Sequence, residues 1–190
     1  GTYGIRNYLL IIPASVCASE TAVNIAKLVN GAIAIPHQHG CCEIGDDFET
    51  TKRTLVGFGK NPNVGAVLVV GLGCEGIQAK EIADEIAESG KPVDYIVIQD
   101  ECGTCKTVAK GVEIAGKMSR ELAKQNKTEF DISEIILGLE CGGSDPTSGL
   151  ASNPTIGVAS DMLVNDGGSS ILSETTECIG AEHLLAERFP

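Results

Sequence analysis

The sequence lacks tryptophan and is poor in aromatic and basic residues. Aromatic side chains make up 4% of the 190 residues, so a core must be built from Ile, Val, Leu and Ala. There are 14 Lys and Arg against 26 Asp and Glu, a formal net charge of −12. Nucleic acids and anionic membranes bind basic surfaces, so this balance argues against both as partners. A small anionic ligand would need a local positive centre, either a metal ion or a few Lys and Arg.

Long apolar runs and export signals are also missing. No apolar stretch approaches the length that crosses a bilayer, and no basic segment precedes a short apolar one near the N-terminus. We therefore expect a cytoplasmic protein. Disulfides are rare in that compartment, so the eight cysteines favour metal binding or catalysis over disulfide bonds.

Short apolar runs alternate with segments of helical spacing along the chain, which indicates an α/β fold. The predicted strands are residues 8–13, 32–36, 64–70, 95–98, 135–139 and 169–173. The predicted helices are residues 20–29, 48–58, 77–88, 107–125, 153–164 and 177–188. This alternation is typical of a Rossmann-like three-layer sandwich, with a mostly parallel sheet of about six strands and helices on both faces. We expect one such domain over residues 1–190, cut from a longer polypeptide.

All eight cysteines lie in or near segments that follow predicted strands. Right-handed crossovers place every strand-to-helix loop at the carboxyl edge of a parallel sheet, where ligands bind. We therefore expect a functional site at that edge. The segment with the most varied chemistry is Glu-Cys-Gly-Gly-Ser-Asp at residues 140–145, because its glycines admit a ligand and its side chains offer acceptors, donors and a soft metal ligand. Residues 37–42 add two His and two Cys within one loop.

Two motifs leave other functions open. Gly-Leu-Gly-Cys-Glu-Gly at residues 71–76 matches the dinucleotide fingerprint, with Asp100 about 20 residues further on, and indicates an NAD(P)-binding oxidoreductase. Against this, the fingerprint normally follows the first strand of its unit, and a Cys-Glu pair occupies the place of the pyrophosphate. A lone CxxC at residues 102–105 suits a redox motif, half a zinc site or neither, so a zinc-stabilised binding module is a further alternative.

Several segments together carry a family resemblance. They are Gly-Ile-Arg-Asn-Tyr at 4–8, Gly-Cys-Glu at 73–75, Lys-Thr at 106–107, Leu-Gly-Leu-Glu-Cys-Gly-Gly-Ser-Asp at 137–145, Asn-Pro at 153–154, Gly-Val-Ala-Ser-Asp at 157–161, Ser-Glu-Thr at 173–175 and Gly-Ala-Glu-His at 180–183. These segments resemble the altronate and galactarate dehydratase family, which also includes sulfolactate sulfo-lyase.

The resemblance implies a hydro-lyase that depends on Fe²⁺. Such an enzyme removes water from a sugar acid such as altronate or galactarate to give a 2-keto-3-deoxy acid, and a sulfo-lyase acting on sulfolactate is the alternative within the family. The resemblance also implies contact with an N-terminal gating domain or subunit, and we expect a homo-oligomer.

Elimination of water from a polyhydroxy carboxylate needs a cation at the carboxylate, a base for the α-proton and an acid for the leaving hydroxyl. We expect Fe²⁺ or another divalent metal, or an iron–sulfur cluster held by three thiolates. The predicted metal ligands are His37, Cys41, Cys74 and Cys141. The predicted catalytic acids and bases are Glu75, Glu140, Glu174 and His39. The predicted substrate-binding residues are Gly142, Gly143, Ser144, Asp145 and Lys106.

Overall fold

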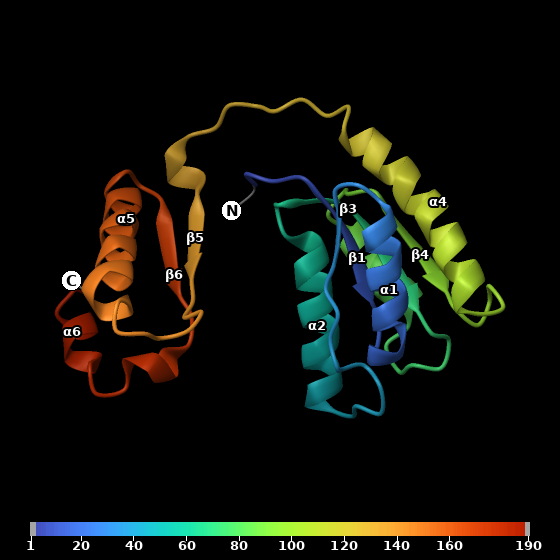
Figure 1. The fold of residues 1–190 in the computed structure, drawn as a ribbon, viewed down its shortest axis with the longest axis horizontal. Helices are drawn as coiled ribbons and strands as arrows, with labels where there is room; N and C mark the ends of the chain where they lie inside the picture. The colour runs from blue at the N-terminus through green and yellow to red at the C-terminus, as the bar shows by residue number, and fades with distance from the viewer. Residues whose placement is uncertain (1–2, 189–190) are drawn as a thin grey trace. The chain divides into compact units, whose positions relative to one another are not determined.

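The computed structural model describes residues 3–188. The chain divides into two compact units, Gly4–Lys127 and Thr128–Pro190 together with Gly1–Tyr3. Each unit is built on its own parallel sheet (Figure 1). None of the helices in the described part of the chain combines the length and the apolar composition that crossing a bilayer requires.

The first unit alternates strands and helices. Its elements are β1 (Tyr8–Pro13), α1 (Val16–Leu28), β2 (Ala32–Ala34), α2 (Asp46–Lys60), β3 (Val64–Gly71), α3 (Ala79–Ala87), β4 (Val93–Val97) and α4 (Thr104–Leu122). The strands pair in the order β2-β1-β3-β4, and every pair is parallel. Consequently the loops that follow the strands all leave from one edge of this sheet.

The core of the first unit lies on both faces of the two central strands. Consecutive residues of β1 point to opposite faces, so Leu9 and Ile11 pack with α1 and α4, whereas Leu10 and Ile12 pack with α2 and α3. In β3 all residues except Gly65 are buried. A strand buried on both faces must be apolar throughout, which is why these runs are recognisable in the sequence.

The second unit is smaller and more open. Its elements are η1 (Ile132–Glu134), β5 (Ile136–Leu139), η2 (Ser148–Ser152), α5 (Asn153–Asn165), β6 (Ser169–Leu172), η3 (Thr175–Cys178) and α6 (Glu182–Ala186). Strands β5 and β6 form a two-stranded parallel sheet, joined through α5. None of the described residues 128–188 is buried, and apolar side chains such as Ile136 and Leu172 remain about half exposed, at 48% and 56%.

The sheet arrangement corrects one expectation from the sequence. The described strands form a four-stranded and a two-stranded sheet instead of one sheet of about six strands. Pairing partners are set by contacts between distant segments, which local patterns do not encode. The predicted helix at residues 177–188 is also interrupted, because Gly180 has a φ of +88° and ends the short helix η3 before α6 begins. That residues 1–190 act as one domain of a longer chain stays a prediction.

Candidate functional site

A cleft of about 1080 Å³ opens in the second unit. It is lined by the loop after β5, by α5 and by the segment after β6. Seven of the residues predicted from the sequence lie along it: Glu140, Cys141, Gly142, Gly143, Ser144, Asp145 and Glu174. The loop after the strand predicted at 135–139 therefore lines the cleft, and its part in the chemistry stays a prediction.

Three potential metal ligands meet inside this cleft. The Cys141 thiol and the carboxylates of Glu174 and Glu177 each place one ligand atom within 4.8 Å of the others. The register of the sheet explains the meeting, because Leu139 pairs with Leu172 and both Cys141 and Glu174 follow two residues later. The Cys141 amide also donates a hydrogen bond to Glu174 Oε2 at 3.1 Å.

The backbone at Glu174 is unusual. Its φ of 57° and ψ of 62° lie in the left-handed region, which a residue with a side chain adopts only at a cost. The Glu177 amide donates to the Glu174 carbonyl at 2.8 Å and so fixes the turn. Strained residues concentrate at functional sites, and this one holds a carboxylate beside Cys141.

Asp145 organises the turn that precedes η2. Its Oδ1 accepts hydrogen bonds from the Thr147 hydroxyl at 2.6 Å, the Thr147 amide at 2.7 Å and the Ser148 amide at 3.1 Å. These bonds hold the pKa of Asp145 below its ordinary value, and the Thr147 hydroxyl and amide contribute most. Asp145 thus stabilises the loop that carries Gly142 and Gly143, and its role in substrate binding stays a prediction.

The cleft is strongly acidic. Its lining includes one basic side chain, Arg188, which pairs with Asp161. The acidic side chains along it are Glu140, Asp145, Asp161, Glu174 and Glu177. Sequence reasoning missed Arg188, because nothing in its local pattern distinguishes it from other charges on a terminal helix. An anionic ligand entering this cleft would be repelled unless a bound cation reversed the local charge.

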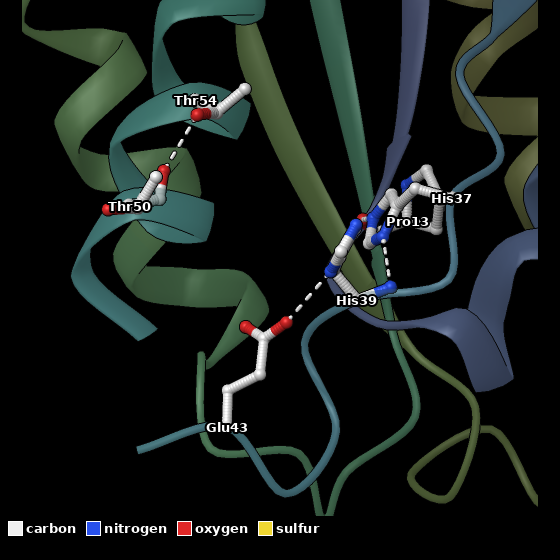
Figure 2. Close-up of polar contacts among 6 residues, drawn as sticks. All are labelled: Pro13, His37, His39, Glu43, Thr50 and Thr54. Carbon is white, nitrogen blue, oxygen red and sulfur yellow. Dashed lines mark hydrogen bonds and ion pairs between the residues drawn. The ribbon is translucent and has the colours of Figure 1, made fainter. Parts of the chain in front are cut away.

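The loop after β2 presents His37 and His39 very differently (Figure 2). The His37 ring lies against the Pro13 carbonyl, with Nε2 at 2.7 Å from that oxygen, and its Nδ1 accepts the His39 amide at 3.2 Å. Because Nδ1 is an acceptor, Nε2 carries the proton and donates to Pro13. Both ring nitrogens are therefore engaged with the backbone, and the assignment of His37 as a metal ligand stays a prediction.

Among residues 3–188, His39 forms a side-chain contact through one of its two ring nitrogens. Its Nδ1 lies 3.0 Å from Glu43 Oε1, and its side chain is 67% exposed. Burial raises the pKa of Glu43, but the nearby polar groups of Thr51, Gly40 and His39 outweigh it, so the pKa is lowered overall. Glu43 was not among the predicted site residues, although its place four residues after His39 was visible in the sequence.

Two neighbouring thiols of the same loop lie side by side. Cys41 Sγ and Cys42 Sγ are 3.8 Å apart, and both side chains are exposed. Cys42 raises the pKa of the Cys41 thiol through a hydrogen bond and through charge repulsion, and burial and the nearby Cys17 raise it further. Cys17 comes from the start of α1, which contacts this loop through a hydrogen bond from the Val16 amide to the His39 carbonyl at 2.8 Å.

Glu75 is engaged with its own loop. It is 4% exposed, and its carboxylate accepts the Leu72 amide at 3.0 Å and the Gly73 amide at 2.6 Å. Gly71 makes room for it, since a Cβ there would lie 2.5 Å from Glu75 Oε1. The carboxylate thus occupies the backbone amides that a pyrophosphate would need, and the structure gives the oxidoreductase alternative no support.

The predicted site residues outside the cleft do not come together in one group of ligand atoms. Among residues 3–188, the set in the cleft is the one group of three His, Cys, Asp or Glu ligand atoms that approach within 4.8 Å of one another. His37, Cys41 and Cys74, all in the first unit, do not form such a group. Lys106 lies in the first turn of α4, where no ion pair to it is formed by the described residues. The roles of these residues, like those of Glu75 and His39 as acids or bases, stay predictions.

Comparison with known proteins identifies the family. Residues 1–123 match the family described as D-galactarate dehydratase/Altronate hydrolase, second domain, and residues 132–190 match D-galactarate/Altronate dehydratase, C-terminal. The chain belongs to this family of sugar-acid dehydratases, as its motifs suggested.

The relatives carry several names. The chain is 36% identical to the beta subunit of (2R)-sulfolactate sulfo-lyase from Chromohalobacter salexigens, over 99% of the chain and 48% of that protein. It is 35% identical to altronate dehydratase from Bacillus subtilis, over 99% of the chain and 39% of that protein. Galactarate dehydratase (L-threo-forming) from Escherichia coli is 36% identical over 72% of the chain and 27% of its own length. The chain thus spans less than half the length of these relatives, and no solved structure matches it.

Proposed function

We propose that this chain carries the catalytic centre of a hydro-lyase that removes water from a sugar acid such as altronate or galactarate. The observation that supports it is the group of Cys141, Glu174 and Glu177 within the cleft, in a chain whose relatives are named dehydratases and a sulfo-lyase. The product would be a 2-keto-3-deoxy acid, formed when the enol left by elimination becomes a ketone.

The donor set suits a divalent first-row metal. One thiolate and two carboxylates bind ions such as Fe²⁺ and leave further coordination positions for a substrate. The surplus of acidic side chains supports the same conclusion, because a sugar acid would not enter this cleft without a compensating cation. When bound, the cation would act as a Lewis acid toward the substrate oxygens.

The remaining side chains would do the proton chemistry. Glu140 lines the cleft but is outside the three-residue ligand group, so it is free to take the proton from the carbon next to the carboxylate. The hydroxyl on the neighbouring carbon would leave as water after it receives the proton that Glu140 removed, so that no proton is gained or lost overall. Arg188 is the cation of the protein itself that can meet a substrate carboxylate. The glycines at 142 and 143 would let the substrate approach the backbone.

The test uses the full-length protein purified without oxygen. We expect bound iron by elemental analysis and turnover of altronate or galactarate, and we expect Glu174→Gln and Cys141→Ser to lose both. The matched controls are Glu134→Gln and Cys178→Ser, which alter the same unit outside the cleft. Iron content and turnover that survive in Glu174→Gln and Cys141→Ser would refute the proposal.

Sulfo-lyase chemistry is the second candidate. It is favoured by the 36% identity to a sulfo-lyase subunit over 99% of the chain. The same elimination would then release sulfite in place of water. Parallel assays of the full-length protein with sulfolactate and with the two sugar acids, reading sulfite and keto acid separately, decide between the candidates.

A further inference from the structure

We propose that two apolar surfaces of the second unit are covered, in the full-length protein, by polypeptide outside residues 1–190. One is the face of the β5–β6 sheet that is turned away from α5, and the other is the side of α5 that is turned away from the sheet. Neither surface belongs to the cleft, because Ile136, Ile171, Val158 and Met162 are not among the residues that line it. The proposal does not depend on the hydro-lyase chemistry.

The register of β5 and β6 identifies the open face of the sheet. The Ser160 hydroxyl of α5 donates to Ser170 Oγ at 2.8 Å, so α5 lies on the face that carries Ser170. Neighbouring residues of a strand point to opposite faces, so Ile171 points away from α5. Its partner in the ladder is Gly138, and Ile136 shares this face because it precedes Gly138 by two residues. Ile171 and Ile136 are 57% and 48% exposed, and a Cβ on Gly138 would meet nothing within 4 Å among the described residues.

The outer side of α5 is apolar as well. Val158 and Met162 are four residues apart, so they lie one above the other on the helix, and they are 59% and 63% exposed. Each is two residues from Ser160, about 200° round the helix, so both point away from the sheet. Asp161 is the single charged residue of α5, whereas α4 forms ion pairs along its exposed side. A helix that is apolar on several sides is normally buried.

These two surfaces leave the second unit without an apolar core. None of the described residues 128–188 is buried. A two-stranded sheet is marginally stable in water, and further strands or further packing are needed for independent stability. Extended apolar patches on the surface of a protein mark places that pack against another part or partner. Covering both surfaces would therefore supply the burial that the second unit lacks.

The placement of the two surfaces on opposite sides of the unit decides which partner covers them. A twofold dimer forms through one self-complementary patch on each subunit, so one second copy would cover one of the two surfaces. Further segments of the same polypeptide can pack on both sides, as the layers of a larger α/β domain do. The relatives have room for such segments, since the chain corresponds to 48% of the sulfo-lyase subunit and 39% of the Bacillus subtilis altronate dehydratase.

The first experiment identifies what covers each surface. A photo-cross-linking amino acid replaces Ile171 in one variant of the full-length protein and Val158 in another. We expect cross-links to peptides outside residues 1–190, in a product that keeps the mass of one chain. The matched control has the same amino acid in place of Glu113, an exposed residue of α4, and should give no such product. A product with the mass of two chains, or cross-links only to peptides within residues 1–190, would overturn the proposal.

The second experiment needs no substitution on either surface. Hydrogen peroxide oxidises methionine to the sulfoxide where solvent reaches the sulfur, so Met162 reports on the outer side of α5. In the folded full-length protein, we expect Met162 to be oxidised at least about tenfold more slowly than the methionine introduced by Glu113→Met, at a position that is 65% exposed. In urea the two rates should be equal.

Mass spectrometry of the peptides measures both oxidation rates at several protein concentrations. Oxidation of Met162 as fast as at the control position in the folded protein would overturn the proposal, and so would protection that is lost on dilution, because a second copy would then be the cover. Protection at every concentration is the expected result. Neither experiment uses turnover, so failure of the hydro-lyase proposal leaves this one intact, and the reverse also holds.

Discussion

The two units of the chain differ in how much apolar surface they bury. In the first unit, both faces of β1 and β3 are covered by helices, and residues such as Ile11 and Leu68 are inaccessible to solvent. In the second unit, none of the described residues is buried. The first unit is therefore held by packing, whereas the second relies on the β5–β6 ladder and on side-chain hydrogen bonds such as those of Asp145. We therefore expect substitutions to displace the group of Cys141, Glu174 and Glu177 in the second unit more easily than the buried residues of the first unit.

Truncating one leucine in each unit gives the largest expected difference. Leu68→Ala removes a fully buried side chain from β3 and should lower the free energy of unfolding by about 3 kcal/mol, because it loses apolar burial and leaves a cavity. Leu184→Ala, at a 56% exposed position of the second unit, should cost less than about 1 kcal/mol. Urea unfolding of the 190-residue chain, followed by far-ultraviolet circular dichroism, measures both. Equal losses at the two positions would contradict the difference in packing.

The next prediction concerns Glu75, whose carboxylate stabilises the loop after β3. The Glu75 carboxylate accepts two backbone amides, whereas the carboxamide of Glu75→Gln has one acceptor oxygen and one donor NH2 group. The substitution should therefore lower the free energy of unfolding by about 2 kcal/mol. Glu20→Gln, an exposed position on α1, is the control and should change little. Urea unfolding and turnover are measured on the same samples. A variant of normal stability that has lost turnover would instead assign Glu75 a catalytic role.

The difference in burial between the two units also explains how much of the fold could be predicted from the sequence. The apolar runs at 8–13 and 64–70 predicted β1 and β3, because strands buried on both faces are apolar throughout. The helix expected from residue 20 in fact starts at Val16, so Cys17 belongs to a helix and not to a loop. The pairing of β5 with β6 in a separate sheet could not be read locally, since register is decided between segments 33 residues apart, as for Ile136 and Ser169.

The sequence indicated several residues of the candidate site, but it did not indicate which of them meet. Cys141 and Glu174 were each identified by type and by their place after a strand, but their meeting follows from the register of β5 and β6. His37 and His39 look alike in sequence, and only the position of the Pro13 carbonyl separates them. Arg188 gave no signal in the sequence, because its place beside the cleft depends on how the second unit folds.

A smaller effect is expected at Arg188. We propose that Arg188 binds the substrate carboxylate equally well in the ground state and in the transition state. Arg188→Gln removes this charge-assisted hydrogen bond, so it should raise KM about tenfold with little change in kcat. Steady-state kinetics of the full-length protein measure the change. Arg120→Gln, in the last turn of α4, is the control. A fall in kcat without a change in KM would place Arg188 in the chemical step instead.

The smallest expected effect is the titration of Asp145, which tests whether its hydrogen bonds stabilise the turn before η2. Asp145 has a pKa below its ordinary value of 3.8, so its contribution to the turn is present above that pH and is lost as the pH falls through the lowered pKa. The Thr147 and Ser148 amides, which donate to Asp145, should therefore shift in NMR spectra with a midpoint below pH 3.8. Asp145→Asn should abolish this titration, whereas Asp166→Asn, beyond α5, should preserve it. A midpoint at or above 3.8 would mean that these hydrogen bonds do not stabilise the ionised carboxylate, and the loop bearing Cys141 would then have to be ordered by the strand pairing alone.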